Sequence, residues 1–190
     1  MGEEIRERLR ELEEVTARAE AVIGDLDEET LNWNPAEGVW SVAQCVDHLS
    51  VTAHRYIEVL EPAIAEARQK GLTGEGPRKR SLSDRMLRWA VEPGRGKVKA
   101  PKMFHPGERM GRETLIASYH EAHATLRRLM EASDGLNLGK VRVVSPVTSL
   151  MRLTLGGAFE VITTHERRHL LQAEKVMELP GFPRKTGAAA

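Results

Sequence analysis

The sequence has a single cysteine, Cys45, among its 190 residues. One thiol cannot form an internal disulfide, so we expect a reducing, cytoplasmic environment. Basic and acidic side chains number 28 each, which gives a formal net charge of zero. This balance argues against a general polyanion binder, because such affinity comes mainly from neutralised phosphates. With three Trp, two Tyr and three Phe, a base-stacking surface for single-stranded nucleic acid is not expected either.

Long apolar runs are also missing from the chain. No stretch approaches the roughly 18–20 apolar residues that a membrane-spanning helix needs, and the N-terminal segment lacks the apolar core of a signal peptide. We therefore expect neither a nucleic-acid partner nor a membrane partner. Apolar residues still make up 41% of the sequence, which is enough for a core. We expect one domain over residues 1–183 and a disordered tail over 184–190.

Apolar residues recur at helical spacing in four long segments of the chain. These segments cover residues 3–23, a stretch that begins at Ser41, residues 112–132 and residues 150–179. Ser41 and Gln44 match a capping box at the start of the second helix, and Pro62 should kink or end that helix.

A short helix is expected over residues 83–91, within the long connection between the second and third helices. No convincing pair of strands is present, although residues 141–144 fit a short extended piece. The fold class is therefore all-α, and the pattern predicts a four-helix bundle.

Charge is distributed unevenly along the sequence. Residues 1–37 hold twelve acidic and four basic side chains, whereas residues 78–109 hold ten basic and three acidic ones. The basic connection can attract an anionic substrate or partner. We favour the other interpretation, a solvated segment whose charge balances the acidic first helix.

The fourth helical segment places two histidines on its apolar stripe. His165 and His169 are four residues apart, so their side chains lie on one face of the helix, about 5–6 Å apart at Cβ. Gln172 follows on the same stripe. Inward-facing imidazoles are costly unless their nitrogens find partners. A divalent metal, which takes nitrogen ligands at about 2.0–2.1 Å, is such a partner. The spacing favours a metal site over a pair of core histidines.

Further ligands must come from the other helices, because two histidines do not complete a metal site. His48 flanks the apolar stripe of the second helix and can point inward. His123 lies on the stripe of the third helix together with Tyr119. It is a fourth ligand, a hydrogen-bond donor near the site, or a core histidine bonded to a neighbour, and Tyr119 is a candidate for the surrounding pocket.

The sequence from His165 to His169 also reads His-Glu-x-x-His, the pattern of zinc metalloproteases. Two features disfavour that function. Gln172 occupies the position at which the extended form of the motif needs glycine, and no sheet edge is expected to hold an extended peptide. A zinc metalloprotease is therefore the least favoured of the functions considered.

Two separate motifs carry a resemblance to a known family. The first is Leu-Asn-Trp at 31–33 followed by Gly-Val-Trp-Ser-Val-Ala-Gln-Cys-Val-Asp-His-Leu at 38–49, and the second is His-Glu-x-x-His-x-x-Gln at 165–172. Over nearly its whole length the chain resembles the DinB/YfiT-like superfamily, whose members are regarded as metalloenzymes. The resemblance implies a bundle of up-down-down-up topology. It also implies a divalent metal bound by one histidine of the second helix and two of the fourth, which are His48, His165 and His169.

The resemblance further implies the kind of activity. Relatives include S-transferases that use bacillithiol or mycothiol, so we expect a thiol-dependent S-transferase or a hydrolase acting on a small molecule. Three neutral imidazoles suit Zn, Ni or Fe(II) and leave open positions on a dication. Such a cation stabilises the thiolate of a substrate thiol or lowers the pKa of a bound water. The alternative is a noncatalytic bundle that binds a metal or a small ligand. One departure from the family is Leu170, where many members carry another histidine.

Several residues near these histidines are candidates for the pocket, and none is assigned as catalytic. Cys45, one turn before His48, is a nucleophile, a ligand or, as we favour, a small buried apolar residue. Asp47 either orients a ligand imidazole or is solvated. Trp40 either lines the pocket mouth or anchors the loop, and Glu166 is expected in a surface ion pair. A homodimer is expected from the resemblance and from the frequency of symmetric assemblies.

Overall fold

The computed structural model describes residues 1–74, 79–95 and 100–184. The described residues form six α-helices, one 3-10 helix and one β-hairpin. In chain order these elements are α1 (Glu3–Ile23), α2 (Glu28–Leu31), α3 (Val42–Gln69), α4 (Leu82–Val91), η1 (Lys102–Phe104), α5 (Arg112–Glu131), β1 (Arg142–Ser145), β2 (Thr148–Thr154) and α6 (Leu155–Met177). Of the tail expected at 184–190, all but Arg184 lies outside the described residues.

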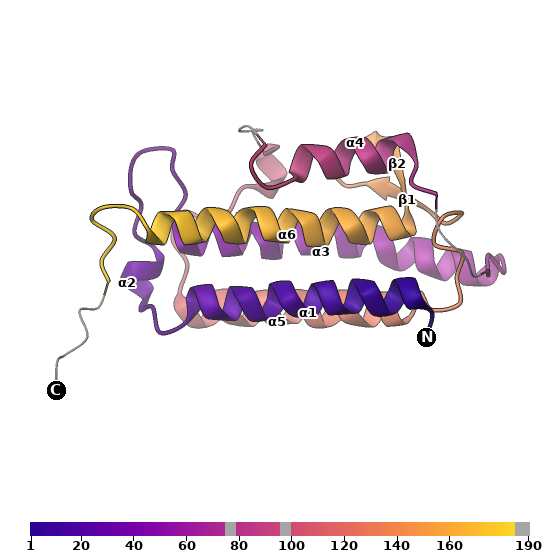
Figure 1. The fold of residues 1–190 in the computed structure, drawn as a ribbon, viewed down its shortest axis with the longest axis horizontal. Coiled ribbons are helices and arrows are strands. Elements are labelled where there is room, and N and C mark those ends of the chain that lie inside the picture. The colour runs from indigo at the N-terminus through magenta and orange to yellow at the C-terminus, as the bar shows by residue number, and fades with distance from the viewer. Residues whose placement is uncertain (75–78, 96–99, 185–190) are drawn as a thin grey trace.

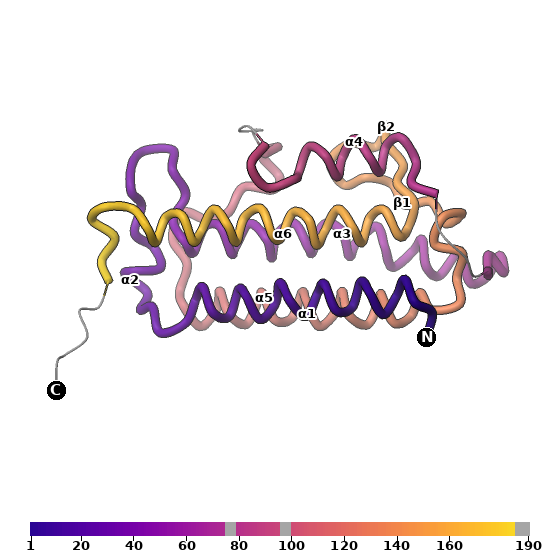
Figure 2. The backbone as a smooth tube through the Cα atoms, in the orientation of Figure 1, coloured from indigo at the N-terminus to yellow at the C-terminus, as the bar shows by residue number. Residues whose placement is uncertain are grey.

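The four long helices α1, α3, α5 and α6 lie alongside one another and enclose one apolar core (Figure 1; Figure 2). α3 and α1 each contact both α5 and α6. The short helix α4 lies on the outer side of α6, next to the hairpin. The mostly helical fold that the sequence predicts is therefore confirmed. No helix in the described part of the chain is long and apolar enough to cross a membrane.

The start of α3 is fixed by the capping box that the sequence predicts. The Ser41 hydroxyl accepts a hydrogen bond from the Gln44 backbone N–H at 3.1 Å, and the Gln44 side chain accepts one from the Ser41 N–H at 3.0 Å. Pro62 does not end this helix, which continues to Gln69. A proline removes one backbone hydrogen bond, and Ile64 and Ala67 beyond it are buried in the core. Their burial favours continuation of the helix.

The hairpin corrects two expectations, the absence of paired strands and a fourth helix that begins near residue 150. β1 pairs with β2 in antiparallel register, with Val143 opposite Leu153 and both side chains buried. α6 begins only at Leu155, because the Thr154 hydroxyl caps it by accepting the Gly157 N–H at 3.0 Å. Leu150 belongs to β2 and is 94% exposed.

A buried aspartate joins α4 to the start of α6. The Asp84 carboxylate accepts hydrogen bonds from the Thr154 N–H at 2.9 Å, the Thr154 hydroxyl at 2.8 Å and the Ser81 N–H at 2.8 Å. Gly157 lies directly against this carboxylate, and a Cβ at that position would overlap it. The close approach explains why a glycine stands in the first turn of α6, where it is otherwise unfavourable.

We expect Gly157→Ala to destabilise the protein. The added methyl group would displace Asp84 from Thr154, so the free energy of unfolding should fall by about 1–3 kcal/mol, as for overpacked core sites. Urea denaturation followed by circular dichroism measures this change. Gly111→Ala is the matched control, because a Cβ there meets only ordinary van der Waals contacts. Equal stability of the two variants would contradict the proposed role of the Gly157–Asp84 contact.

Candidate metal centre

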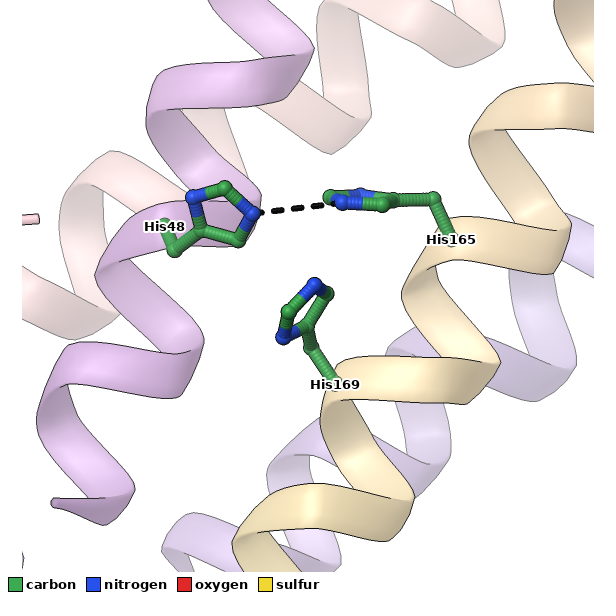
Figure 3. Close-up of side chains that lie close together, drawn as sticks. All are labelled: His48, His165 and His169. Carbon is green, nitrogen blue, oxygen red and sulfur yellow. Dashed lines mark hydrogen bonds between the residues drawn. The ribbon is translucent and has the colours of Figure 1, made fainter. Parts of the chain in front are cut away.

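Three histidines from two helices face one another in the interior between α3 and α6 (Figure 3). His48 comes from α3, and His165 and His169 come from consecutive turns of α6. The Nε2 atoms of His48 and His165 are 3.2 Å apart. One ring nitrogen from each of the three residues lies within 4.8 Å of the others. His48 and His169 are buried, and His165 is partly buried.

Hydrogen bonds fix which ring nitrogen faces the centre in two of these histidines. The Nδ1 of His48 is 2.6 Å from the backbone carbonyl of Phe104, and the Nδ1 of His169 is 3.0 Å from the Gln172 side-chain carbonyl. Because a carbonyl oxygen only accepts, each Nδ1 carries the proton and donates it. Nε2 is therefore left with its lone pair, the form in which a neutral imidazole binds a metal.

The three rings are uncharged at neutral pH. Burial lowers the pKa of His169 to about 3, with further lowering by His48 and Arg168. Burial also lowers the pKa of His165 well below its ordinary value, and its neighbours His169 and His48 add to this. For His48 burial again dominates and lowers the pKa, against the opposing hydrogen bond to Phe104. An extra proton shared between two of the rings would create a charged imidazolium and is therefore disfavoured, whereas a neutral His165 can donate its own Nε2–H to His48 Nε2.

A divalent cation fits this arrangement better. Two nitrogens bound to Zn²⁺ at about 2.0–2.1 Å and at a tetrahedral angle lie about 3.3 Å apart, close to the 3.2 Å between His48 and His165. The cluster contains no carboxylate or thiol. Three neutral ligands would leave the full double charge on the ion, and three protein ligands are typical of catalytic zinc sites, which keep an open position.

The chain segment between η1 and α5 supports His48, and side chains from elsewhere in the chain hold that segment in place. Phe104 is buried in η1, and its carbonyl bonds His48. The segment that follows is tied down by Asp47, whose carboxylate accepts the Gly107 N–H at 2.8 Å, and by Asn32, which bonds both the N–H and the C=O of Met110. Asp47 therefore neither contacts a histidine ring nor is left solvated, the two roles that the sequence suggested. It fixes the chain segment that supplies the Phe104 carbonyl.

Trp40 covers one side of the three-histidine cluster. Its ring centroid is 4.8 Å from that of His48 and 5.7 Å from that of His169. Gln172, the next residue on the α6 stripe, accepts the Nδ1 proton of His169. Trp40 and Gln172, two of the residues that the sequence placed near the site, thus contact it. Cys45 does not join the cluster: it is fully buried, and burial raises the pKa of its thiol to about 12.

His123 and Tyr119 lie away from the cluster and belong to a second buried group around Glu166. The Tyr119 hydroxyl donates to Glu166 Oε2 at 3.0 Å, and His123 Nε2 is 3.3 Å from Glu166 Oε1. His123 Nδ1 donates to the Tyr119 carbonyl at 2.9 Å, and the two rings stack. Burial would lower the pKa of His123, but the Glu166 carboxylate outweighs it and raises the pKa.

The buried position of Glu166 overturns the expected surface ion pair, since its side chain is only 2% exposed. The reason is that α6 is covered on several sides, by α1, α3 and α4, so a residue off its histidine stripe is also buried. The His-Glu-x-x-His motif by itself does not indicate that Glu166 is buried. The available signal was the run of mostly small or apolar residues over 155–164, interrupted by Glu160, because a helix segment that is apolar on all sides is a buried one.

Comparison with known proteins yields one match. The model of the family described as the DinB superfamily matches residues 11–173, most of the chain. No curated protein and no solved structure matches it.

We expect the purified chain to bind one divalent ion, and His48→Ala, His165→Ala or His169→Ala each to weaken binding at least about tenfold, since each removes a ligand. Isothermal titration with Zn²⁺ measures the affinity. His120→Ala is the control, because His120 is an exposed residue of α5. Unchanged affinity in all three variants would show that the ion binds elsewhere.

The thiol of Cys45 should be inert in the folded protein. With a pKa of about 12 and no exposure, it forms almost no thiolate near neutral pH, and the thiolate is the reactive form. Ellman's reagent should therefore react in minutes with the urea-unfolded chain and at least about a hundredfold more slowly with the folded one. Rapid labelling of the folded chain would contradict the burial of Cys45.

Proposed function

The chain belongs to the DinB superfamily, and from this premise we propose that it is a metal-dependent enzyme that transfers a thiol to a small electrophile. One observation carries the proposal: three uncharged imidazoles converge between α3 and α6 with no carboxylate among them. Such a set retains the full charge of a divalent cation. The direction of the four long helices in Figure 1 supports the up-down-down-up order of the family.

Each residue of the proposed site has a role that follows from its position. His48, His165 and His169 would hold the ion, which can be Zn, Ni or Fe(II). When bound, the cation supplies Lewis acidity, which lowers the pKa of a thiol placed on it. The Phe104 carbonyl and Gln172 keep the Nε2 atoms of His48 and His169 directed at the ion. Trp40 excludes water from one side of the histidine rings.

The proposed reaction is a substitution at an electrophilic carbon. The thiol gives up its proton to solvent, its sulfur forms a bond to that carbon, and the leaving group departs with its electron pair. The chain's own task is to bind and orient the two reactants, because the lowered thiol pKa removes the need for a strong base.

Hydrolysis is the second candidate, since a bound water is activated in the same way. The residues around the three histidines favour a thiol over a water molecule as the activated nucleophile. The two carboxylates next to the histidines in sequence are both engaged elsewhere, Asp47 with Gly107 and Glu166 with Tyr119 and His123. Neither is placed as a general base for water. The same engagement of Glu166 removes the base that a His-Glu-x-x-His protease requires. The alternative that is not an enzyme is a helical bundle that binds a metal without catalysing a reaction.

We expect the full chain loaded with Zn²⁺, Ni²⁺ or Fe²⁺ to accelerate conjugation of a low-molecular-weight thiol with monochlorobimane. His165→Ala should lower the rate at least about a hundredfold, because it removes a ligand of the activating ion. Fluorescence of the conjugate measures the rate, and His120→Ala is the control.

Two outcomes separate the rival functions. Hydrolysis of p-nitrophenyl acetate by the loaded chain, without thiol conjugation, would favour the hydrolase. Metal binding with neither activity, across bacillithiol, mycothiol, glutathione and cysteine, would contradict the transferase and favour the binding module.

A further inference from the structure

Helix α4 carries an apolar stripe on its solvent side. Leu82, Met86 and Trp89 follow one another at spacings of four and three residues, so they share one face of the helix. Their exposed fractions are 82%, 55% and 55%. A helix on the surface of a globular protein ordinarily turns such a stripe toward the core. In α4 the stripe is directed outward.

Contacts on the inner side of α4 hold it in this orientation. Asp84 is buried against Thr154, and the Ser83 hydroxyl donates to the Arg152 carbonyl of β2 at 2.8 Å. At the other end, Arg168 of α6 donates to the Glu92 carbonyl at 3.1 Å. Because both ends are fixed by polar contacts, α4 cannot roll to bury the outward stripe without breaking them.

Basic side chains surround the stripe. Lys79 and Arg85 form no ion pair with a residue that the structure describes, and Arg95 lies over the Trp89 ring at 4.6 Å. Arg88 and Arg95 share one acidic partner, Glu92. The face as a whole is therefore apolar at its centre and positive at its rim.

The protein is also electrically asymmetric. α1, which belongs to the acidic segment 1–37, and α4 lie on opposite sides of α6 (Figure 1). Within the basic segment 78–109, Arg80 lies within electrostatic reach of Glu4 and Glu7 of α1. An extended anionic surface would attract the α4 side of the molecule and repel the α1 side.

We propose that the α4 face docks on an anionic phospholipid bilayer. Apolar and tryptophan side chains between lysines and arginines are the pattern of helices that lie in the membrane interface. Leu82, Met86 and Trp89 enter the boundary of headgroups and acyl chains, and Lys79 and Arg85 face the anionic headgroups. Leu150 of β2, a strand that packs against α4, is 94% exposed as well.

Two arguments select a lipid surface over a second copy of the chain. Pairing two α4 faces would bring two positive rims together, which costs free energy unless anions intervene. The stripe also protrudes, as the exposure of Leu82 shows, and protruding side chains suit insertion into a bilayer. The proposal replaces the expectation that the chain has no membrane partner. It is independent of the three-histidine site, since docking needs no metal.

Vesicle flotation with the full, metal-loaded chain tests the docking. We expect binding to phosphatidylcholine vesicles that contain about one-third phosphatidylglycerol, weakening at high salt, and little binding to phosphatidylcholine alone. Arg85→Gln should lower the partition coefficient about fivefold. Leu82→Ser should lower it about tenfold, because the apolar contribution is lost.

Matched controls lie outside the α4 face. Arg10→Gln removes one exposed positive charge from α1, and Leu179→Ser removes an exposed leucine beyond α6. Neither should change the partition coefficient more than about twofold. Brominated lipids should quench the fluorescence of Trp89, so quenching should be lost in Trp89→Phe. Circular dichroism confirms that each variant folds.

Three outcomes would overturn the proposal. These are no binding to the anionic vesicles, equal binding to neutral ones, or equal losses in the α4 variants and their controls. Sedimentation velocity adds a fourth: a dimer that Leu82→Ser converts to monomer, without vesicle binding, would show that a second copy covers this face.

Discussion

The Nε2 atoms of His48 and His165 face each other across 3.2 Å, and both rings are uncharged because burial lowers their pKa values. Because His48 Nε2 carries a lone pair, this contact is either a hydrogen bond donated by the Nε2–H of a neutral His165 or the separation of two ligands of one cation. The opposite nitrogens of His48 and His169 are already committed to carbonyl acceptors. A divalent metal ion is a partner that all three neutral rings can bind at once. The proposed chemistry follows from the charge that such a set leaves on the ion.

Much of the remaining structure serves this geometry. The capping box at Ser41 fixes where α3 begins and so the turn on which His48 lies. Asp47 and Asn32 tie down the segment that brings the Phe104 carbonyl to His48. Glu166, next to His165, is bonded to Tyr119 of α5. These contacts join α3 and α6 to η1, to α5 and to the segment that runs from Gly107 to Met110.

The sequence predicted what depends on local pattern. The helical spacing of His165 and His169 placed both on one face, the capping box located α3, and the short helix near 83–91 was found because each signal lies within one turn or one segment. The features that the sequence did not reveal depend on contacts between residues that are far apart in the chain. β1 and β2 pair so that Val143 and Leu153 are buried together. The Phe104 carbonyl that bonds His48 is a backbone group, so no residue type marks it. Glu166 was misplaced because periodicity on α6 shows one stripe, while the fold covers several sides.

X-ray absorption spectroscopy of the zinc-loaded full chain tests the central claim most directly. We expect a coordination shell with three imidazole nitrogens at about 2.0–2.1 Å and no sulfur from the protein. A shell with the multiple-scattering pattern of fewer than three imidazoles, or with a sulfur at about 2.3 Å in the absence of added thiol, would contradict it.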